Sequence, residues 1–296
     1  MTSEYINCRI CPRECGVDRT VGPVGFCSSG AVPMVAHYGR HNWEEPPNSG
    51  SLGSGTVFFS GCNLRCSFCQ NRSISSSEVG MPANPKKLAD VFLELGSSCH
   101  NINLVTSAHH LPSVAEGLKF ARSSGLAVPV VYNTSSYEKV EAIRRLDGLV
   151  DIYLPDLKYA SPSLSAELSS ASDYFEVATM AITEMLSQVG HLVLGKDGIA
   201  LKGVLVRHLV LPGQQCDSIR VLEWIRTNLG KYASISIMSQ YTPDFYEGGC
   251  EAMKGRLTAE EYSRVIEKAE ELGFQEVFTQ ERESASAAYV PRFNRI

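Results

Sequence analysis

The apolar residues follow two spacings along the chain, and each spacing predicts one kind of element. Short apolar runs bounded by turn residues predict buried strands, whereas apolar residues three and four positions apart predict helices. Strands are expected at 56–59, 101–106, 128–133, 149–154, 203–211 and 233–238, with a late one at 275–278. Helices are expected at 85–95, 114–121, 136–146, 163–189, 217–229 and 258–272.

Capping and turn residues support two of these predictions. Thr258 is followed three residues later by Glu261, which predicts a capping box at the start of the last helix. The Asp-Gly pair at 197–198 lies between apolar runs and predicts a hairpin within 191–201.

Strand and helix patterns alternate along most of the chain, which is typical of a parallel sheet with crossover helices. Right-handed crossovers curl six such strands into a partial barrel. We therefore predict an α/β fold with a partial (β/α)6 barrel at residues 51–280. A cysteine-rich segment at 1–50 precedes the barrel, and a tail at 281–296 follows it.

Composition narrows the class of protein. The chain has 296 residues, of which 44% are hydrophobic, and this suits one large α/β domain with a small appendage. No run reaches the roughly 18 apolar residues of a membrane span, and residues 1–8 lack the pattern of a signal peptide. The net charge of −5, without a long Lys/Arg tract, argues against direct nucleic-acid binding.

Ten cysteines in such a chain indicate metal ligands and free thiols rather than disulfides. We therefore expect a reducing compartment and a cytoplasmic protein. Three of the cysteines, Cys62, Cys66 and Cys69, follow the first predicted strand with the spacing C-x3-C-x2-C. Three thiolates leave one position of a metal site open, and an open position is where chemistry takes place.

This segment resembles the cysteine loop of the radical S-adenosylmethionine (radical SAM) superfamily. The resemblance implies that Cys62, Cys66 and Cys69 hold three irons of a [4Fe–4S] cluster and that S-adenosylmethionine chelates the fourth. It also implies that one electron cleaves this cofactor to a 5′-deoxyadenosyl radical, with Phe68 near the adenine. The alternative is a zinc site whose fourth ligand lies elsewhere in the chain.

The resemblance extends to residues at the ends of later strands. Asp156 and Lys158 follow the fourth strand, and alternation places both on one face. Their tripeptide is similar to the Asp-Leu-Lys of the glycyl-radical-enzyme activases, which lies in the cofactor site. Arg207 is similar to an arginine that faces the cofactor carboxylate, a role that suits its bidentate fork. Asn133 and Met238 are further expected cofactor contacts, although a turn-forming role for Asn133 is the alternative.

Two departures from the family pattern concern the cofactor pocket. Members carry a Gly-Gly-Glu type motif after the second strand, where this chain has Val105-Thr-Ser-Ala-His-His-Leu-Pro112. Ser107, His109 or Thr106 is expected to substitute in binding the cofactor. Many activases also have a histidine after the sixth strand, and Tyr241 takes that position here.

A second set of cysteines lies at the N-terminus, at Cys8, Cys11, Cys15 and Cys27. Their segment is too short and turn-rich for an apolar core of its own, and such units usually need a metal to fold. Four thiolates close a site around zinc or a second iron–sulfur cluster. The site is then either a structural staple or an auxiliary cluster that passes electrons or contacts substrate, with free buried thiols as a third reading. Three other cysteines have no ligand-like spacing: Cys99, Cys216 and Cys250.

The N-terminal cysteines and the polar segment 40–50 together resemble a subgroup of uncharacterised relatives of pyruvate formate-lyase activating enzyme. Within that segment, His41, Trp43, Glu44 and Glu45 form either a lid or a strap beside the cluster. We expect a radical SAM enzyme that abstracts hydrogen from a substrate.

Three hypotheses for its task stay open. The first is an activase acting on a glycyl radical site in a partner protein. The second is an enzyme that modifies a peptide or a small molecule. The third is an iron–sulfur sensor or electron-transfer protein without turnover. An enzyme of this kind needs a reductant such as flavodoxin or ferredoxin.

Overall fold

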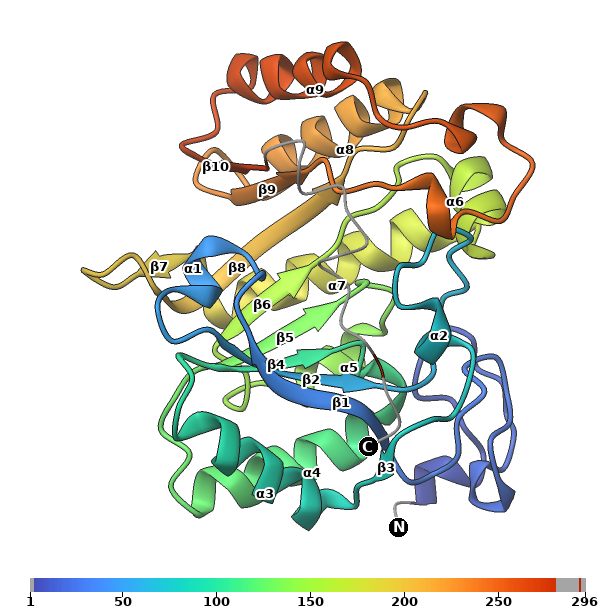
Figure 1. Ribbon diagram of the computed structural model, residues 1–296, viewed down its shortest axis with the longest axis vertical. Helices are drawn as coiled ribbons and strands as arrows, with labels where there is room; N and C mark the ends of the chain where they lie inside the picture. The colour runs from blue at the N-terminus through green and yellow to red at the C-terminus, as the bar shows by residue number, and fades with distance from the viewer. Residues whose placement is uncertain (1–2, 281–292, 294–296) are drawn as a thin grey trace.

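The computed structural model describes residues 3–280 and 293, and one curved sheet forms its centre (Figure 1). The strands lie in the order β10-β9-β8-β6-β5-β4-β2-β1-β3, and β7 pairs with β8 off this path. The parallel part consists of β2 (Ser54–Phe59), β4 (Ile102–Val105), β5 (Val130–Thr134), β6 (Ile152–Pro155), β8 (Ala200–Leu209), β9 (Ser234–Met238) and β10 (Glu276–Thr279). The fold is thus the predicted α/β partial barrel, and the late strand is present as β10.

Helices connect the parallel strands and cover the outside of the sheet. In Figure 1, α3 (Pro85–Gly96) and α4 (Leu111–Ser123) pack together below the sheet, and α8 (Gln215–Asn228) and α9 (Ala259–Glu271) pack together above it. A third pair is α5 (Val140–Arg144) with α7 (Tyr174–Val189). The capping box of Thr258 and Glu261 is confirmed at the start of α9.

Two strands extend the sheet beyond its parallel part. β1 (Met34–His41) pairs antiparallel with β2, and β3 (Met81–Pro82) pairs antiparallel with β1. The predicted hairpin is confirmed, since β7 (Val193–Leu194) pairs antiparallel with β8. β1 was not predicted, because its burial does not alternate and its pairing is interrupted between Val35 and His37.

Two predicted helices differ from the observed ones. The helix expected at 136–146 is shortened to α5, because Ser136 has a left-handed φ of 64° and Glu138 bonds inward instead of lying on a helix. The region expected at 163–189 is split into α6 (Pro162–Ser169) and α7, because Ser170 adopts a left-handed φ of 53° at the end of α6.

The short helix α1 (Pro46–Ser49) lies near the beginnings of the parallel strands (Figure 1). The Asn101 side chain, just before β4, donates a hydrogen bond of 2.7 Å to the carbonyl oxygen of Asn48. The chain between β1 and β2 therefore reaches the end of the barrel opposite to the loops in which βα-barrel chemistry collects.

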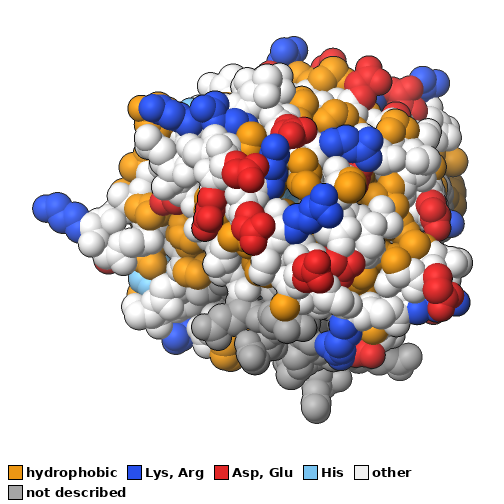
Figure 2. Space-filling view, turned by 90° about the horizontal axis from the view of Figure 1, so that it is seen from above, with side chains coloured by type: hydrophobic (Ala, Val, Ile, Leu, Met, Phe, Trp, Pro, Cys, Tyr) orange, Lys and Arg blue, Asp and Glu red, His pale blue; other side chains and the backbone are white. Residues whose placement is uncertain are grey.

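The outer surface over α8 and α9 carries interspersed charges of both signs, with apolar side chains between them (Figure 2). Such mixing is usual for a solvated face. Among the described residues, none of the helices combines the length and the apolar character needed to cross a membrane.

Candidate active site

The loop after β2 brings Cys62, Cys66 and Cys69 to a cavity of about 240 Å³ at the carboxyl ends of the parallel strands. In a βα barrel this is the end at which catalytic residues collect. The cavity walls come from the segment before β2, the cysteine loop and the ends of later strands. The lining includes Glu44, Glu45, Cys62, Cys66, Cys69, Thr106, Asn133, Asp156, Lys158, Arg207 and Met238.

The three thiols are partly buried and have few polar neighbours. The Ser169 hydroxyl donates to Cys66 Sγ at 3.0 Å, and the backbone N–H of Leu64 points at Cys62 Sγ at 3.3 Å. Burial raises the pKa of the Cys62 and Cys69 thiols, and the neighbouring Cys66 raises both further. Without a metal these two cysteines are therefore neutral thiols, and a metal must displace their protons to bind.

Asp156, Lys158 and Arg207 form one ion-pair network on the wall of this cavity. Lys158 Nζ donates to Asp156 Oδ2 at 2.5 Å, and Arg207 Nε donates to Asp156 Oδ1 at 2.9 Å. Asn133 joins them, because its Oδ1 accepts from Arg207 Nη2 at 2.6 Å. The structure thus brings together four residues that the sequence placed in or directly after three different strands.

Burial and pairing act in opposite directions on these charged groups. Burial tends to raise the pKa of Asp156, but Arg207 and Lys158 together hold it below its ordinary value. Burial tends to lower the pKa of Lys158, but Asp156 and then Cys66 raise it above its ordinary value. The pKa of Arg207 is likewise raised, because its carboxylate neighbours outweigh burial. All three side chains are therefore charged at neutral pH.

Glu44 is a member of this network that the sequence did not assign to the cofactor site. Its Oε1 accepts from Arg207 Nη1 at 3.2 Å, and its Oε2 accepts from Asn103 at 2.7 Å and Asn133 at 3.1 Å. The next residue, Glu45, is only 5% exposed and also lines the cavity. Burial raises the pKa of Glu45 to about 7, although Arg207 opposes this.

Of the other residues expected near the cofactor, two line the cavity and three do not. Met238 and Thr106 line the cavity, and Thr106 has a left-handed φ of 58°. Among the described residues, Ser107, His109 and Phe68 are not part of the lining. Ser107 lies in the turn behind Thr106, where the chain enters a short 3₁₀ helix, so its side chain is buried outside the cavity.

His109 has a different location from the one expected. It lines the pocket of the N-terminal cysteines, and its Nε2 lies 2.8 Å from the carbonyl oxygen of Ser60. Burial, followed by the charge of Arg19, lowers its pKa to about 3, so it is neutral.

Phe68 packs against Tyr241, with ring centroids 6.1 Å apart. The Tyr241 hydroxyl donates to the carbonyl oxygen of Met253, and Tyr241 is not among the residues that line the cavity. His208, the residue after Arg207 in β8, is a buried packing histidine, because its Nδ1 lies 2.7 Å from the carbonyl oxygen of Leu157 and its Nε2 lies 2.9 Å from the Ser218 hydroxyl.

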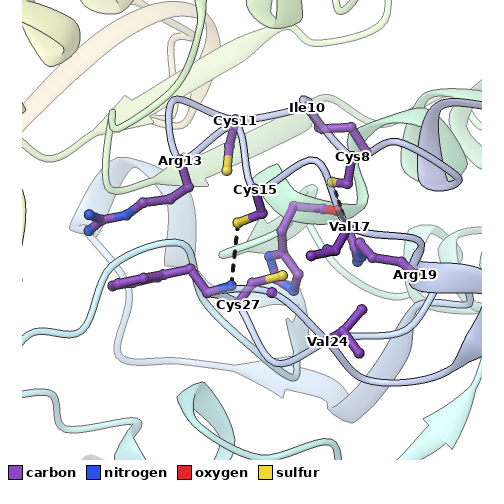
Figure 3. A pocket seen from close by; sticks show the side chains of 12 residues that line it. Cys8, Ile10, Cys11, Arg13, Cys15, Val17, Arg19, Val24 and Cys27 are labelled. Atoms are coloured by element: carbon purple, nitrogen blue, oxygen red, sulfur yellow. Dashed lines mark hydrogen bonds between the residues drawn. The ribbon is translucent and has the colours of Figure 1, made fainter.

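The four N-terminal cysteines surround a second, small pocket (Figure 3). Cys8, Cys11 and Cys27 are buried, whereas Cys15 is exposed. All ten cysteines of the chain are free of disulfides. The Cys15 sulfur accepts a hydrogen bond of 3.4 Å from the backbone N–H of Phe26.

The two sets of cysteines are the candidate metal ligands of this protein. Among the described residues, no group of three or more His, Cys, Asp or Glu side chains converges on one metal-ion position. At the loop after β2, three soft thiols next to a charged, partly enclosed cavity fit a cluster with one open position. A cube gives each thiolate its own iron, so its ligands need not converge as closely as those of a single ion.

Comparison with known proteins gives one related sequence and a fold. No family model matches the chain. The chain is 30% identical over 279 residues to the uncharacterized protein MJ0674 of Methanocaldococcus jannaschii, covering 90% of this chain and 75% of that protein.

Among solved structures, SuiB of Streptococcus suis bound to the precursor peptide SuiA aligns with a TM-score of 0.51 and 11% identity. SuiB bound to S-adenosylmethionine aligns with a TM-score of 0.50 and 13% identity. Both alignments cover 74% of this chain, and they cover 46% and 48% of SuiB, so the chain spans about half of that protein's length. At such identities the likeness shows a shared fold.

Proposed function

We propose that this chain, which belongs to the family of the Methanocaldococcus protein MJ0674, is a radical SAM enzyme, because it combines the C-x3-C-x2-C cysteine loop with a fold that it shares with SuiB. In this proposal Cys62, Cys66 and Cys69 bind a [4Fe–4S] cluster and the adjoining cavity binds S-adenosylmethionine. One observation carries it. The three thiols and the network of Asp156, Lys158 and Arg207 line the same cavity.

The charged residues of that cavity match the charges of the cofactor. Arg207 and Lys158 can bind the methionine carboxylate, and Asp156 can bind the ammonium group. When bound, the cluster supplies the electron that cleaves S-adenosylmethionine to methionine and a 5′-deoxyadenosyl radical. The chain's own contribution is to hold these groups in place before the cofactor arrives, because the ion pairs already fix the side chains.

A peptide is the substrate class that we favour. SuiB, which shares the fold, is known in complex with a precursor peptide, and this supports a barrel of this kind accepting a chain segment. Glu44 and Glu45 line the same cavity, so an amide or amine of the substrate would find acceptors there. The similarity of Asp156, Lys158 and Arg207 to activase residues supports an activase of a glycyl radical site as the second candidate. A flavodoxin or ferredoxin is the proposed reductant for either task.

Cofactor cleavage is the first property to test. The protein is reconstituted anaerobically with iron and sulfide, reduced with dithionite and mixed with S-adenosylmethionine, and 5′-deoxyadenosine is measured by chromatography. A Cys62/Cys66/Cys69→Ala variant should form none. A Cys99/Cys216/Cys250→Ala variant removes the same number of thiols outside the cluster loop and should match the wild type. If fully loaded wild-type protein cleaves nothing, the enzyme proposal is wrong and a sensor or electron-transfer role replaces it.

The substrate class can be tested without knowing the substrate. Cells are grown on deuterated medium, and their extract is divided by ultrafiltration into a macromolecular and a small-molecule fraction. Each fraction is added to a separate reaction. Deuterium in 5′-deoxyadenosine marks the fraction that gave up a hydrogen. Deuterium transfer from the macromolecular fraction supports a peptide or protein substrate. Transfer only from the small-molecule fraction contradicts both candidates.

A further inference from the structure

Arg19 is a buried cation at the pocket of the N-terminal cysteines. Its side chain is 1% exposed, and within the described part of the chain no carboxylate lies within ion-pair distance of it. Its N–H groups instead donate to the carbonyl oxygens of Ser29 at 2.9 Å, Gly30 at 2.7 Å and His109 at 2.6 Å. A buried charge that is hydrogen-bonded but unpaired is costly, so a negative group is expected nearby.

The nearest groups that can become negative are the N-terminal thiols. Arg19 Nη1 lies 3.7 Å from Cys8 Sγ, and Arg19 lines the same pocket as Cys8, Cys11, Cys15 and Cys27 (Figure 3). Four neutral thiols do not balance a guanidinium. Four thiolates around one Zn²⁺ or around an iron–sulfur cube carry a net negative charge, and they do balance it.

We propose that Cys8, Cys11, Cys15 and Cys27 bind a metal–thiolate centre and that Arg19 is its buried counter-ion. The centre is either a zinc ion or an iron–sulfur cluster, and both are bound by the same four thiolates. The centre is separate from the open cluster site at Cys62, Cys66 and Cys69, because four protein ligands leave no position for a cofactor.

The centre is built against the loop that carries the catalytic cysteines. A Cβ on Gly61 would lie 2.7 Å from the carbonyl oxygen of Cys27, so the two cysteine segments touch directly at this glycine. Arg13, between two of the N-terminal cysteines, donates to the carbonyl oxygen of Asn63 at 2.9 Å. In the opposite direction, Arg65 Nη2 donates a hydrogen bond of 3.1 Å to the carbonyl oxygen of Phe26. Loss of the N-terminal metal should therefore loosen the Gly61–Arg65 part of the catalytic loop.

The experiment isolates this centre by removing the other one. The Cys62/Cys66/Cys69→Ala variant is purified anaerobically, once as isolated and once after reconstitution with iron and sulfide, and iron, sulfide and zinc are counted per chain. We expect it to retain about four irons with sulfide, or about one zinc. Iron with sulfide identifies a cluster and zinc identifies a staple, and either result supports the site. Retention of neither metal overturns the proposal.

Two further variants in the same background assign the ligands and the counter-ion. Cys15→Ser changes the exposed ligand, so it tests metal loss with little risk to folding, and the retained metal should fall to near zero. Arg19→Met removes the charge and keeps the unbranched apolar stem of the side chain, and metal release to a chelator should become at least about tenfold faster. Cys216→Ser, at an exposed cysteine outside the pocket, is the control for both. Unchanged metal content in Cys15→Ser, or unchanged release in Arg19→Met, contradicts the corresponding assignment.

Discussion

Replacing Arg207 by Met should both destabilise the protein and change how its stability depends on pH. Arg207 has three hydrogen-bonded side-chain partners in the cavity wall, at 2.9 Å to Asp156, 3.2 Å to Glu44 and 2.6 Å to Asn133. Its own side chain is 12% exposed, so solvent screens these pairs little. Removing one member of such a buried pair costs about 3–5 kcal/mol, because the partner is left buried and charged. We expect a loss of unfolding free energy in this range at pH 7.

The pH dependence follows from the Asp156 carboxyl. In the wild type its pKa is held below the ordinary value, so it contributes stability at neutral pH that is lost as the pH falls. Without Arg207, burial has more influence and the pKa of Asp156 rises. The folded variant then takes up a proton at a higher pH than the wild type does. The stability deficit of Arg207→Met should therefore shrink as the pH is lowered from about 7 to about 5.

Urea unfolding followed by circular dichroism at several pH values measures this deficit. Arg72→Met is the matched control, because Arg72 is 44% exposed and its partner Glu247 is 68% exposed, and a surface pair of this kind contributes at most about 1 kcal/mol. A deficit for Arg207→Met no larger than that of the control would refute the reasoning. So would a large deficit that is the same at both ends of the pH range, since it would reflect lost packing alone.

Three further outcomes are expected. In the folded wild type Glu45 keeps its proton up to a pKa of about 7, whereas the unfolded chain releases it near 4.5, so the unfolding free energy should fall by about 3 kcal/mol between about pH 4 and pH 8. Glu45→Gln should remove this fall. Urea titrations that give parallel pH curves for the two proteins would contradict the prediction. Gly61→Ala should lower the metal content of the N-terminal site, because its Cβ would strike Ser29 and Cys27 at a φ of 83°; unchanged metal content would show that the contact can relax. Thr258→Ala should lower the unfolding free energy by about 1 kcal/mol through loss of the α9 cap, measured by urea unfolding, and a loss below about 0.3 kcal/mol would contradict this.

The parallel strands could be predicted because each is a short apolar run whose neighbours in the chain are also its neighbours in space. β4, β5 and β6 follow one another in both orders, so local pattern and topology agree. β1 could not be predicted in this way. Its residues are mostly half-buried, and its pairing with β2 shifts register between Val35 and His37, which removes the regular alternation.

The candidate site was predictable where a residue lies in a motif and not where it depends on distant contacts. Asp156, Lys158 and Arg207 were expected in one pocket, and the structure brings them together. Glu44 was missed as their partner because it reaches Arg207 across 163 residues of sequence. Arg19 gave no local signal either, since only the fold shows that its hydrogen-bond partners are carbonyl oxygens and that a thiol lies beside it.

Glu44 lies in the chain before the first parallel strand, and this position limits how the protein can be divided into modules. A fragment beginning at residue 51 would keep every parallel strand, yet it would lack the carboxylate that faces Arg207 and the strand that covers the edge of β2. It would thus have an unpaired sheet edge that invites aggregation and an unbalanced charge in its cofactor cavity. The smallest autonomous unit must include the segment from Met34, and grafting this barrel into another protein would have to carry that segment with it.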